Sequence, residues 1–316
     1  MAGRHLRLMG HSIEIIGTES LGVRGLSCFI RAGTRRILID PGVALGYMRH
    51  GLRPHPLQVA EGERIRRRII KASTEATDII LSHFHGDHVP LKEANPYQLA
   101  IHHLPPGFRN VRCWSKSMDD PGEKMRQRAL DLSALSGTNF HVAESLSEGP
   151  MTFSSAVPHG IKGSRQGTVM MTRIDLGEQV FVHASDIQLL DAETIELIIA
   201  WHPDIVLAAG PPLYLQRLPD ELAGAAWQNA LRLAARVDTL ILDHHLMRDR
   251  QGPAWLAALS AKVGKQIWCA ADFMGKKRLL LEASRTELYE KMAVPTHWHE
   301  NYAAGLINLV QGVNHA

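Results

Sequence analysis

Apolar residues recur in short blocks over the first forty positions of the chain. Three blocks, HSIEIIGTES, GLSCFIRAG and RRILIDPG, are rich in isoleucine, leucine or phenylalanine and are separated by glycine-containing turns. β-branched and aromatic side chains at this spacing favour extended backbone, so the pattern predicts a β-meander over residues 11–42. Asp40 ends the third predicted strand, immediately before Pro41 and Gly42.

A helical period follows the meander. In EGERIRRRIIKAS, Ile65, Ile69 and Ile70 fall on one face of a helix, and the arginines between them point outward. We interpret these arginines as a solvated helix face rather than as an RNA-binding stripe. The next segment, TDIILSH, predicts a buried strand that runs directly into a group of histidines.

The second half of the chain is also rich in predicted strands. Turn residues and the helical pattern PGEKMRQRALDLSAL precede it, and we interpret about 110–135 as a helical cap inserted over a site. TVMMTRIDL and QVFVHASD form a predicted hairpin, and the strands PDIVLAAG and VDTLILDHH flank a predicted helix, DELAGAAWQNALRLAARV. IWCAADF predicts a short strand and GKKRLLLEASRTELYEKM a helix. Without a repeat or linker-like segment, one domain over 1–316 is expected.

Composition is that of an ordinary globular protein, with 45% apolar and 21% charged residues. The net charge of +3 argues against a dedicated nucleic-acid binder, although it leaves a local basic cleft open. No run approaches the ~20 apolar residues that cross a bilayer, and His11, Ser12 and Glu14 interrupt the start before it reaches signal-peptide length. The three cysteines form no CxxC pair, so we expect a reducing, cytoplasmic location.

Four potential metal ligands stand within six positions after the strand TDIILSH: His83, His85, Asp87 and His88. Residues two apart in extended backbone share a face, so His83 and His85 can hold one ion. A turn at Gly86 then lets Asp87 and His88 face a second ion. A lone histidine would more often be structural, but this constellation predicts a metal site. Its donors suit Zn²⁺, and also Mn²⁺ or Fe.

The motif HxHxDH after a strand is the signature of the metallo-β-lactamase superfamily, which the chain resembles over nearly its whole length. The superfamily pattern continues with an early Asp, a distant His, a distant Asp and a final His, each at a strand end. The matching residues here are Asp40, His159, Asp186 and either His244 or His245. The segments ESLGVRG, DPGVALG, GLRPHP and FVHASD further resemble an archaeal and bacterial branch of predicted hydrolases within it.

This resemblance implies an αββα sandwich, two mixed sheets with helices outside, and a centre for two divalent ions. The first ion would be bound by His83, His85 and His159, the second by Asp87, His88 and the final histidine, and Asp186 would bridge them. Asp40 would support the ligands, while a plain turn-forming role before Pro41 stays equally open. Asp87 and Asp40 are the candidate catalytic residues.

The final ligand is open between His244 and His245. Adjacent residues on a strand face opposite ways, so normally only one can ligate, and the superfamily's ending of an apolar strand followed by His favours His244. By the same argument His183, three residues before Asp186, is expected in the core or behind a ligand rather than on a metal.

The implied chemistry is hydrolysis by a hydroxide shared between two metals roughly 3.5 to 4 Å apart. No other nucleophile is needed: Cys28 and Cys113 have no activating His or Asp beside them, and the chain lacks a GxSxG elbow. Three alternatives stay open: a nuclease-like phosphodiesterase, a di-iron oxygen-dependent oxidoreductase, and a non-catalytic metal-binding protein. A homo-oligomer also stays open.

Cations near the motifs favour a small anionic substrate. The loop GIKGSRQG after His159 contains Lys162 and Arg165, which either hold an anionic group or belong to a solvated turn. Arg24 lies in the first predicted hairpin, where superfamily members often build a flap, and Arg126 and Arg128 lie in the expected cap. We therefore expect an anionic ester, with a phosphodiester slightly ahead of a lactone or thioester.

Overall fold

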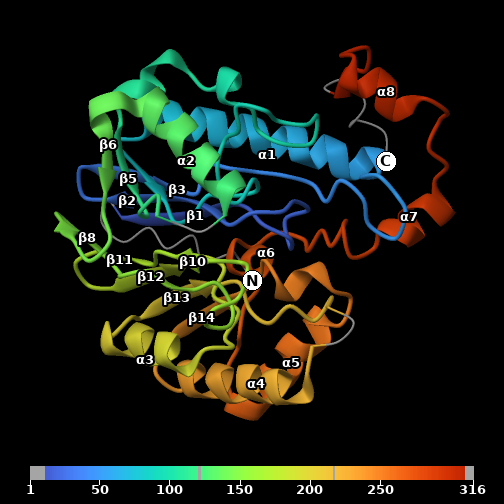
Figure 1. Ribbon diagram of the computed structural model, residues 1–316. Coiled ribbons are helices and arrows are strands. Elements are labelled where there is room, and N and C mark those ends of the chain that lie inside the picture. Colours follow the sequence, from blue (N-terminus) through green and yellow to red (C-terminus); the bar gives the residue numbers. More distant parts are fainter. Residues whose placement is uncertain (1–10, 120–121, 216–217, 310–316) are drawn as a thin grey trace.

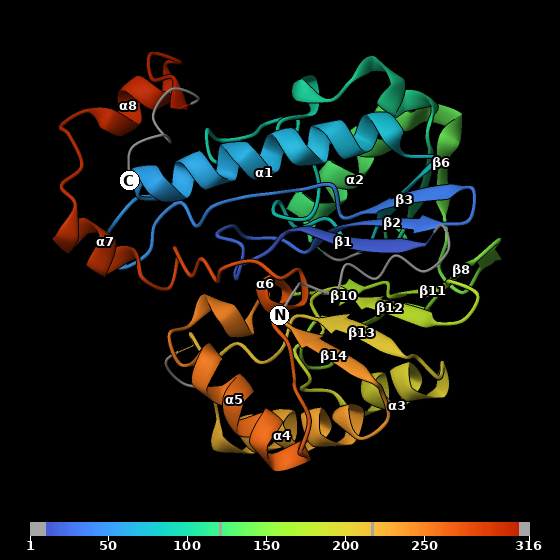
Figure 2. The same ribbon diagram turned by 180° about the vertical axis from the view of Figure 1, so that it is seen from behind.

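The computed structural model describes residues 11–119, 122–215 and 218–309. Two six-stranded sheets face each other, in the orders β1-β2-β3-β4-β5-β6 and β14-β13-β12-β11-β8-β7 (Figures 1 and 2). The first sheet contains β1 (Ser12–Gly17), β2 (Ser27–Ala32), β3 (Arg35–Ile39), β4 (Asp78–Leu81), β5 (Arg112–Ser115) and β6 (Phe140–Val142). The second contains β7 (Ser147–Glu148), β8 (Met151–Phe153), β11 (Thr172–Asp175), β12 (Val180–Ala184), β13 (Ile205–Ala208) and β14 (Thr239–Leu242).

Helices lie on the outer faces of both sheets, with α1 and α2 over the first and α3 and α4 over the second (Figures 1 and 2). The α-helices are α1 (Pro56–Glu75), α2 (Glu123–Ser136), α3 (Ala192–Ala200), α4 (Asp220–Ala234), α5 (Gly252–Val263), α6 (Ala270–Phe273), α7 (Arg285–Lys291) and α8 (Trp298–Ala303). Short 3-10 turns cover Ile101–His103, Pro106–Asn110, Gly137–Asn139 and Leu246–Arg248, and β9 (Val157–Pro158) pairs with β10 (Thr168–Val169). Within the described residues, no helix has the length and hydropathy needed to cross a membrane.

Both sheets are mixed, which confirms the predicted αββα sandwich. The β1-β2-β3 meander is antiparallel, and β4, β5 and β6 continue it in parallel. In the second sheet β12, β13 and β14 are parallel, and β11, β8 and β7 are antiparallel. Parallel strands end at the same edge of a sheet, so the loops after them are brought together.

The alternation of side chains explains the layers. Inward residues of the first sheet, such as Ile30 and Ile80, share one apolar cluster with Ile174 and Phe181 of the second sheet. Outward residues Phe29 and Leu38 instead pack with Ile65 and Ile69 on the buried face of α1. The period of two in the strands therefore gives each strand one apolar face toward the other sheet and one toward a helix, and the 3.6-residue period of α1 gives the helix a matching apolar face.

Residues 110–135 are not an inserted cap, which corrects the sequence-based interpretation. Arg112–Ser115 forms β5, which pairs with β4 on one side and β6 on the other. Ala129 and Leu132 of α2 pack on the outer face of the sheet, in one cluster with Ile79 and Leu81 of β4. A four-residue buried strand shows too little alternation to be recognised from sequence.

The C-terminal predictions are only partly met. The strand predicted over 267–273 is reduced to a single bridge between Ile241 and Trp268, followed by α6. The helix predicted over 275–292 begins at Arg285, in α7, and the residues between α6 and α7 run back across the first half of the chain. Ala271 N, within α6, donates to Ser20 Oγ at 2.9 Å, and in the crossing Leu279 N donates to Ser20 O at 2.7 Å.

Candidate metal centre

The predicted ligands come together where strands of both halves end. The HxHxDH motif follows β4, His159 follows β9, Asp186 follows β12, and the His244-His245 pair follows β14. The arrangement therefore draws its donors from loops that are distant in sequence and adjacent in the fold.

One half of the centre is formed by His83, His85, His159 and Asp186, whose donor atoms all lie within 4.8 Å of one another. His83 Nε2 and His85 Nδ1 are 3.0 Å apart. Asp186 Oδ2 lies 2.5 Å from His159 Nε2 and 3.3 Å from His83 Nε2. These are the residues expected for the first metal.

The other half is formed by Asp87, His88 and His244 together with the second oxygen of Asp186. His88 Nε2 and His244 Nε2 are 3.3 Å apart, and they lie 3.2 Å and 3.4 Å from Asp186 Oδ1. Asp87 Oδ2 is 3.6 Å from His244 Nε2. These residues are those expected for the second metal.

Asp186 stands between the two halves, with Oδ2 turned to one and Oδ1 to the other. The carboxylate is buried, yet Oδ1 has no hydrogen-bond partner among the described residues. A buried carboxylate oxygen surrounded only by imidazole nitrogens costs free energy unless a cation satisfies it. The carboxylate is therefore placed to contact a cation on either side.

The donor set fits two transition-metal ions. Zinc binds imidazole nitrogen at about 2.0–2.1 Å, so two nitrogens on one tetrahedral ion lie roughly 3.3 Å apart. The nitrogen pairs in the two halves, at 3.0 and 3.3 Å, match this separation. Each half also contains a carboxylate oxygen that offsets the charge of the ion.

Burial keeps two of the imidazoles neutral and so ready for a metal. Burial lowers the pKa of His83 to about 3 and also lowers the pKa of His244, so both are neutral near pH 7. Burial opposes the charged form of His88 too, but Asp186 and Asp40 outweigh it and raise the pKa of His88. A metal must then displace a proton there, so we expect metal uptake to release protons.

Asp40 lies behind the second half of the centre. Its Oδ2 contacts His88 Nδ1 at 2.9 Å and accepts from Ser185 Oγ at 2.6 Å, and its Oδ1 accepts from the Ser82 backbone N–H at 2.9 Å. Burial alone would raise the pKa of Asp40, but the hydrogen bond from His88 outweighs it and lowers the pKa to about 2. Asp40 therefore orients His88, and it also occupies the turn before Pro41.

The sequence left the final ligand open between His244 and His245, with normally only one of them able to ligate, and the structure turns both side chains toward the centre. Strand β14 ends at Leu242, and His245 has helical backbone angles, φ −76 and ψ −37. Strand alternation therefore no longer applies. His244 Nε2 lies in the second half, as predicted. His245 has a donor atom within 4.8 Å of those of Asp186 and His244, and its Nε2 lies 3.5 Å from Asp186 Oδ2, the oxygen that faces the first half.

Two charged residues that sequence reasoning missed support His244. Glu19 Oε2 lies 2.8 Å from His244 Nδ1, and Arg248 Nε donates to Glu19 Oε1 at 2.6 Å. Arg248 Nη2 also lies 3.9 Å from Asp87 Oδ2. Glu19 and His244 are 225 residues apart, so no local pattern links them.

The three predicted substrate-binding cations lie in different surroundings. Arg24 is bonded through Nε and Nη2 to Glu282, so its guanidinium is already paired. Lys162 is 79% exposed and 3.6 Å from Glu193, and Arg165 is exposed. None of these cations contacts a metal ligand through a hydrogen bond within the described residues.

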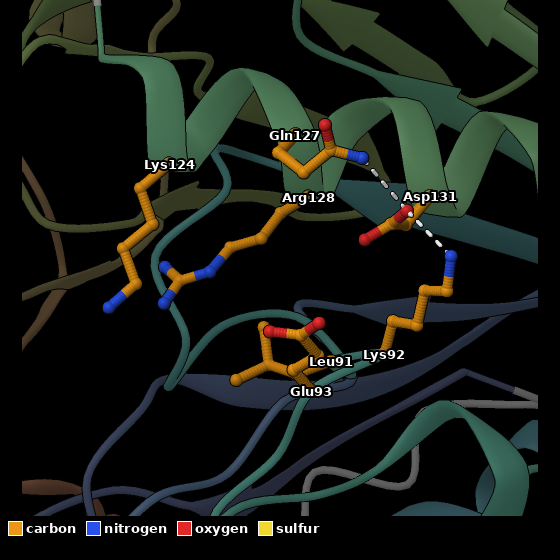
Figure 3. Close-up of a pocket in the computed structure, with 7 residues that line it drawn as sticks. All are labelled: Leu91, Lys92, Glu93, Lys124, Gln127, Arg128 and Asp131. Atoms are coloured by element: carbon orange, nitrogen blue, oxygen red, sulfur yellow. Dashed lines mark hydrogen bonds and ion pairs between the residues drawn. The ribbon is translucent and has the colours of Figure 1, made fainter.

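Helix α2 borders the metal-binding loop without covering the centre. Arg128 Nη1 donates to Phe84 O at 3.0 Å, which ties α2 to the HxHxDH segment. Beside Arg128 is a surface cavity of about 210 Å³, into which Lys124 and Arg128 project from α2, opposite Leu91 and Glu93 (Figure 3). No metal ligand lines this cavity, so it is separate from the centre.

Comparisons with known proteins give close relatives. A UPF0282 protein of Methanosarcina mazei is 47% identical over 293 residues, which cover 93% of this chain and 96% of the relative. A UPF0282 protein of Thermococcus gammatolerans is 33% identical over 304 residues, covering 87% and 94%. No family model matches. Among solved structures, Tm1679, a metal-dependent hydrolase of the β-lactamase superfamily, has a TM-score of 0.48 at 12% identity over 81% of this chain and 94% of that one.

Proposed function

The chain belongs to the UPF0282 family, and from that premise and the geometry of the metal centre we propose that it is a metal-dependent hydrolase of the metallo-β-lactamase type. The orientation of the Asp186 carboxylate is the observation that carries the proposal, because each of its two oxygens faces one of the two groups of imidazoles. The HxHxDH motif and the αββα sandwich support it. The complete ligand set argues against a protein that has lost its metal function.

Two divalent ions held by these ligands would supply a shared hydroxide at neutral pH and polarise the oxygen under attack. The chain's own residues would orient the substrate and the attacking water and would transfer protons. Asp87 is the more exposed carboxylate of the centre, at 20%, and neighbouring His88, His244 and Arg248 outweigh burial and hold its pKa well below the usual range. Asp87 therefore stays ionised and can hold and orient the attacking water beside the second ion.

We propose a small anionic ester as the substrate, with a phosphodiester slightly ahead of a lactone or thioester. Arg248 places a buried guanidinium 3.9 Å from Asp87 Oδ2, and Arg128 is fixed to the backbone of the metal-binding loop. Cations placed there would stabilise charge that develops on the transferring group. Lys162 and Arg165, exposed on the loop after His159, remain proposed contacts for the distal anionic group.

The test begins with metal content and continues with a substrate panel. We expect about two metals per chain by elemental analysis of protein purified without chelator. Zinc- and manganese-loaded protein is then assayed on chromogenic phosphodiester, phosphomonoester, lactone, thioester and sulfate substrates. Asp87→Asn is the matched blank, and we expect it to lose about 100-fold or more in kcat/KM because it removes the ionised carboxylate that orients the water and binds the second ion.

Several outcomes would reject parts of this proposal. One metal per chain, persisting after zinc addition, would reject the binuclear site. Turnover that requires O₂ would replace hydrolysis by oxygen chemistry, and turnover of neutral esters alone would reject the anionic substrate. Unchanged kcat/KM in both Lys162→Ala and Arg165→Ala would remove these two residues from the substrate contacts.

A further inference from the structure

His245 is a buried histidine with one unsatisfied nitrogen. Its side chain is 5% exposed, and Nε2 has no hydrogen-bond partner among the described residues. That nitrogen lies 3.5 Å from Asp186 Oδ2, and the imidazole ring is 5.6 Å from the ring of His159. An imidazole buried only for packing would not leave a polar atom unpaired toward a group of metal donors.

The other nitrogen of His245 is held by Tyr214. Tyr214 Oη lies 2.8 Å from His245 Nδ1, and the two rings stack with their centroids 5.9 Å apart. The guanidinium groups of Arg248 and Arg49 lie over the ring of Tyr214, at 5.0 Å and 5.8 Å from its centroid. A metal-bound histidine usually donates its second ring N–H to such a partner, which fixes the direction of the ring.

We propose that His245 is a fifth protein ligand of the first metal, through Nε2, and that Tyr214 is its positioning residue. The inference rests on the metal centre of the proposed function and adds a donor to it. The first ion would then be bound by His83, His85, His159, His245 and Asp186 Oδ2, and the second by Asp87, His88, His244 and Asp186 Oδ1. Both members of the His244-His245 pair ligate, one on each ion.

The two ions become unequal as a result. With five protein donors, the first ion would have little room for a further ligand. The second ion has four protein donors and lies on the side of Arg248, whose guanidinium is 3.9 Å from Asp87 Oδ2. We infer that the anionic oxygen of the substrate binds at the second ion.

The experiment measures metal binding directly, with zinc alone and cobalt alone as probes. Apoprotein is titrated with each metal against a chromogenic chelator, for wild type, Tyr214→Phe and His245→Phe. Asp87→Asn, which lacks a ligand of the second ion only, identifies which dissociation constant belongs to the first. Tyr289→Phe is the matched control, because it removes a similar contact, Tyr289 Oη to His299 Nε2 at 3.0 Å, which involves no metal ligand.

We expect Tyr214→Phe to weaken the first site by about 10- to 100-fold, as loss of a partner behind a metal ligand does. His245→Phe should weaken it further, and Tyr289→Phe should match wild type. The visible absorption of cobalt in the first site should intensify in His245→Phe, because cobalt absorbs more strongly as its coordination number falls. A purely structural role for His245 would not produce this change.

First-site constants within two-fold of wild type in both variants, with an unchanged cobalt spectrum, would overturn the inference and leave the proposed hydrolase intact. A wild-type protein that binds no metal would overturn both. If His245→Phe fails to fold by circular dichroism, Tyr214→Phe decides the question, because it removes only a hydroxyl group.

Discussion

Asp40 combines an unfavourable backbone conformation with a buried carboxylate that contacts His88. It adopts φ 47, in the left-handed region, and its carboxylate is fully buried. Both conditions are unfavourable in isolation, and they persist because His88, Ser82 and Ser185 bond to the carboxylate. The strained turn and the oriented imidazole therefore depend on the same side chain.

Asp40→Asn separates these two roles, because asparagine accepts left-handed backbone but removes the negative charge. We expect the second-site metal affinity to fall by about 10- to 100-fold, since the partner of His88 Nδ1 is weakened. Competition with a chelator at pH 7 measures this. Asp40→Ala should add a loss of thermal stability that Asp40→Asn lacks, and equal affinity in Asp40→Asn and wild type would contradict the orienting role.

The candidate ligands that are easiest to predict from sequence are those that lie close together along the chain, because their spacing itself indicates a metal site. His83, His85, Asp87 and His88 are local to one loop, so their pattern alone indicates a metal site. The orientation of His245 toward the centre was not predicted, because the rule of alternation holds only within a strand and β14 ends at Leu242. Long-range partners such as Glu19 leave no local signal at all.

At the scale of elements, two glycine-containing turns fix the position of the metal-binding loop. A Cβ on Gly42 would lie 2.2 Å from the His88 carbonyl carbon and from the Val89 nitrogen, and one on Gly25 would lie 2.4 Å from Asp87 O. These neighbours are backbone atoms and cannot rotate away. The loop that contains the second-site ligands therefore packs against bare backbone from both turns.

Gly42→Ala should consequently disturb the centre as well as the fold. We expect it to lower the free energy of unfolding by about 1–3 kcal/mol, through overpacking, and to weaken second-site metal binding. Gly224→Ala is the control, since Gly224 lies within α4 and a Cβ there would meet nothing within 4 Å beyond its own helix backbone. That change should stabilise the protein by about 0.5–1 kcal/mol. Denaturant unfolding compares the two, and a stable Gly42→Ala with normal metal binding would contradict the packing argument.

Element prediction succeeded where segments were long or clearly periodic. The meander over β1 to β3 and the helices α1 and α4 were recognised because their apolar residues repeat with period 2 or 3.6. Strand β5 was missed because four residues, Arg112–Ser115, give no measurable period. Its place in the sheet is decided by pairing with β4, which is tertiary information.

At the scale of the whole molecule, the segment after α6 joins the C-terminal part to the first half. Glu282 is 3% exposed and is bonded to Arg24, with Arg49 and Arg285 at 3.6 and 3.7 Å. Burial would raise the pKa of Glu282, but Arg24 outweighs it and lowers the pKa to about 2. The negative charge is thus stabilised by the folded state.

The sign of the pH dependence follows from this lowered pKa. The stabilisation from Glu282 is fully present above its unfolded pKa, about 4.3, and is lost as pH falls towards 2. Glu282→Gln should lower the free energy of unfolding at pH 7 by about 3 kcal/mol, because it leaves the buried Arg285 and the partly buried Arg24 and Arg49 without their partner. The difference from wild type should shrink between pH 4.5 and pH 2.

Urea unfolding of metal-free protein measures this difference at each pH, so that release of metal does not contribute. Glu300→Gln, which breaks an exposed ion pair with Arg53, should leave stability unchanged at every pH. A pH-independent difference between Glu282→Gln and wild type would show that the charge of Glu282 is not what stabilises this junction.

The separation of the metal ligands along the chain also sets the order of events in folding. His88 and His244 are in contact across 156 residues, so a growing chain displays the HxHxDH motif long before its last partners exist. A metal ion at this centre could not acquire all of these ligands until both sheets have formed and packed. Contacts completed after the rate-limiting barrier slow unfolding without hastening folding. The metals are therefore expected to lengthen the lifetime of the finished protein rather than to guide its formation.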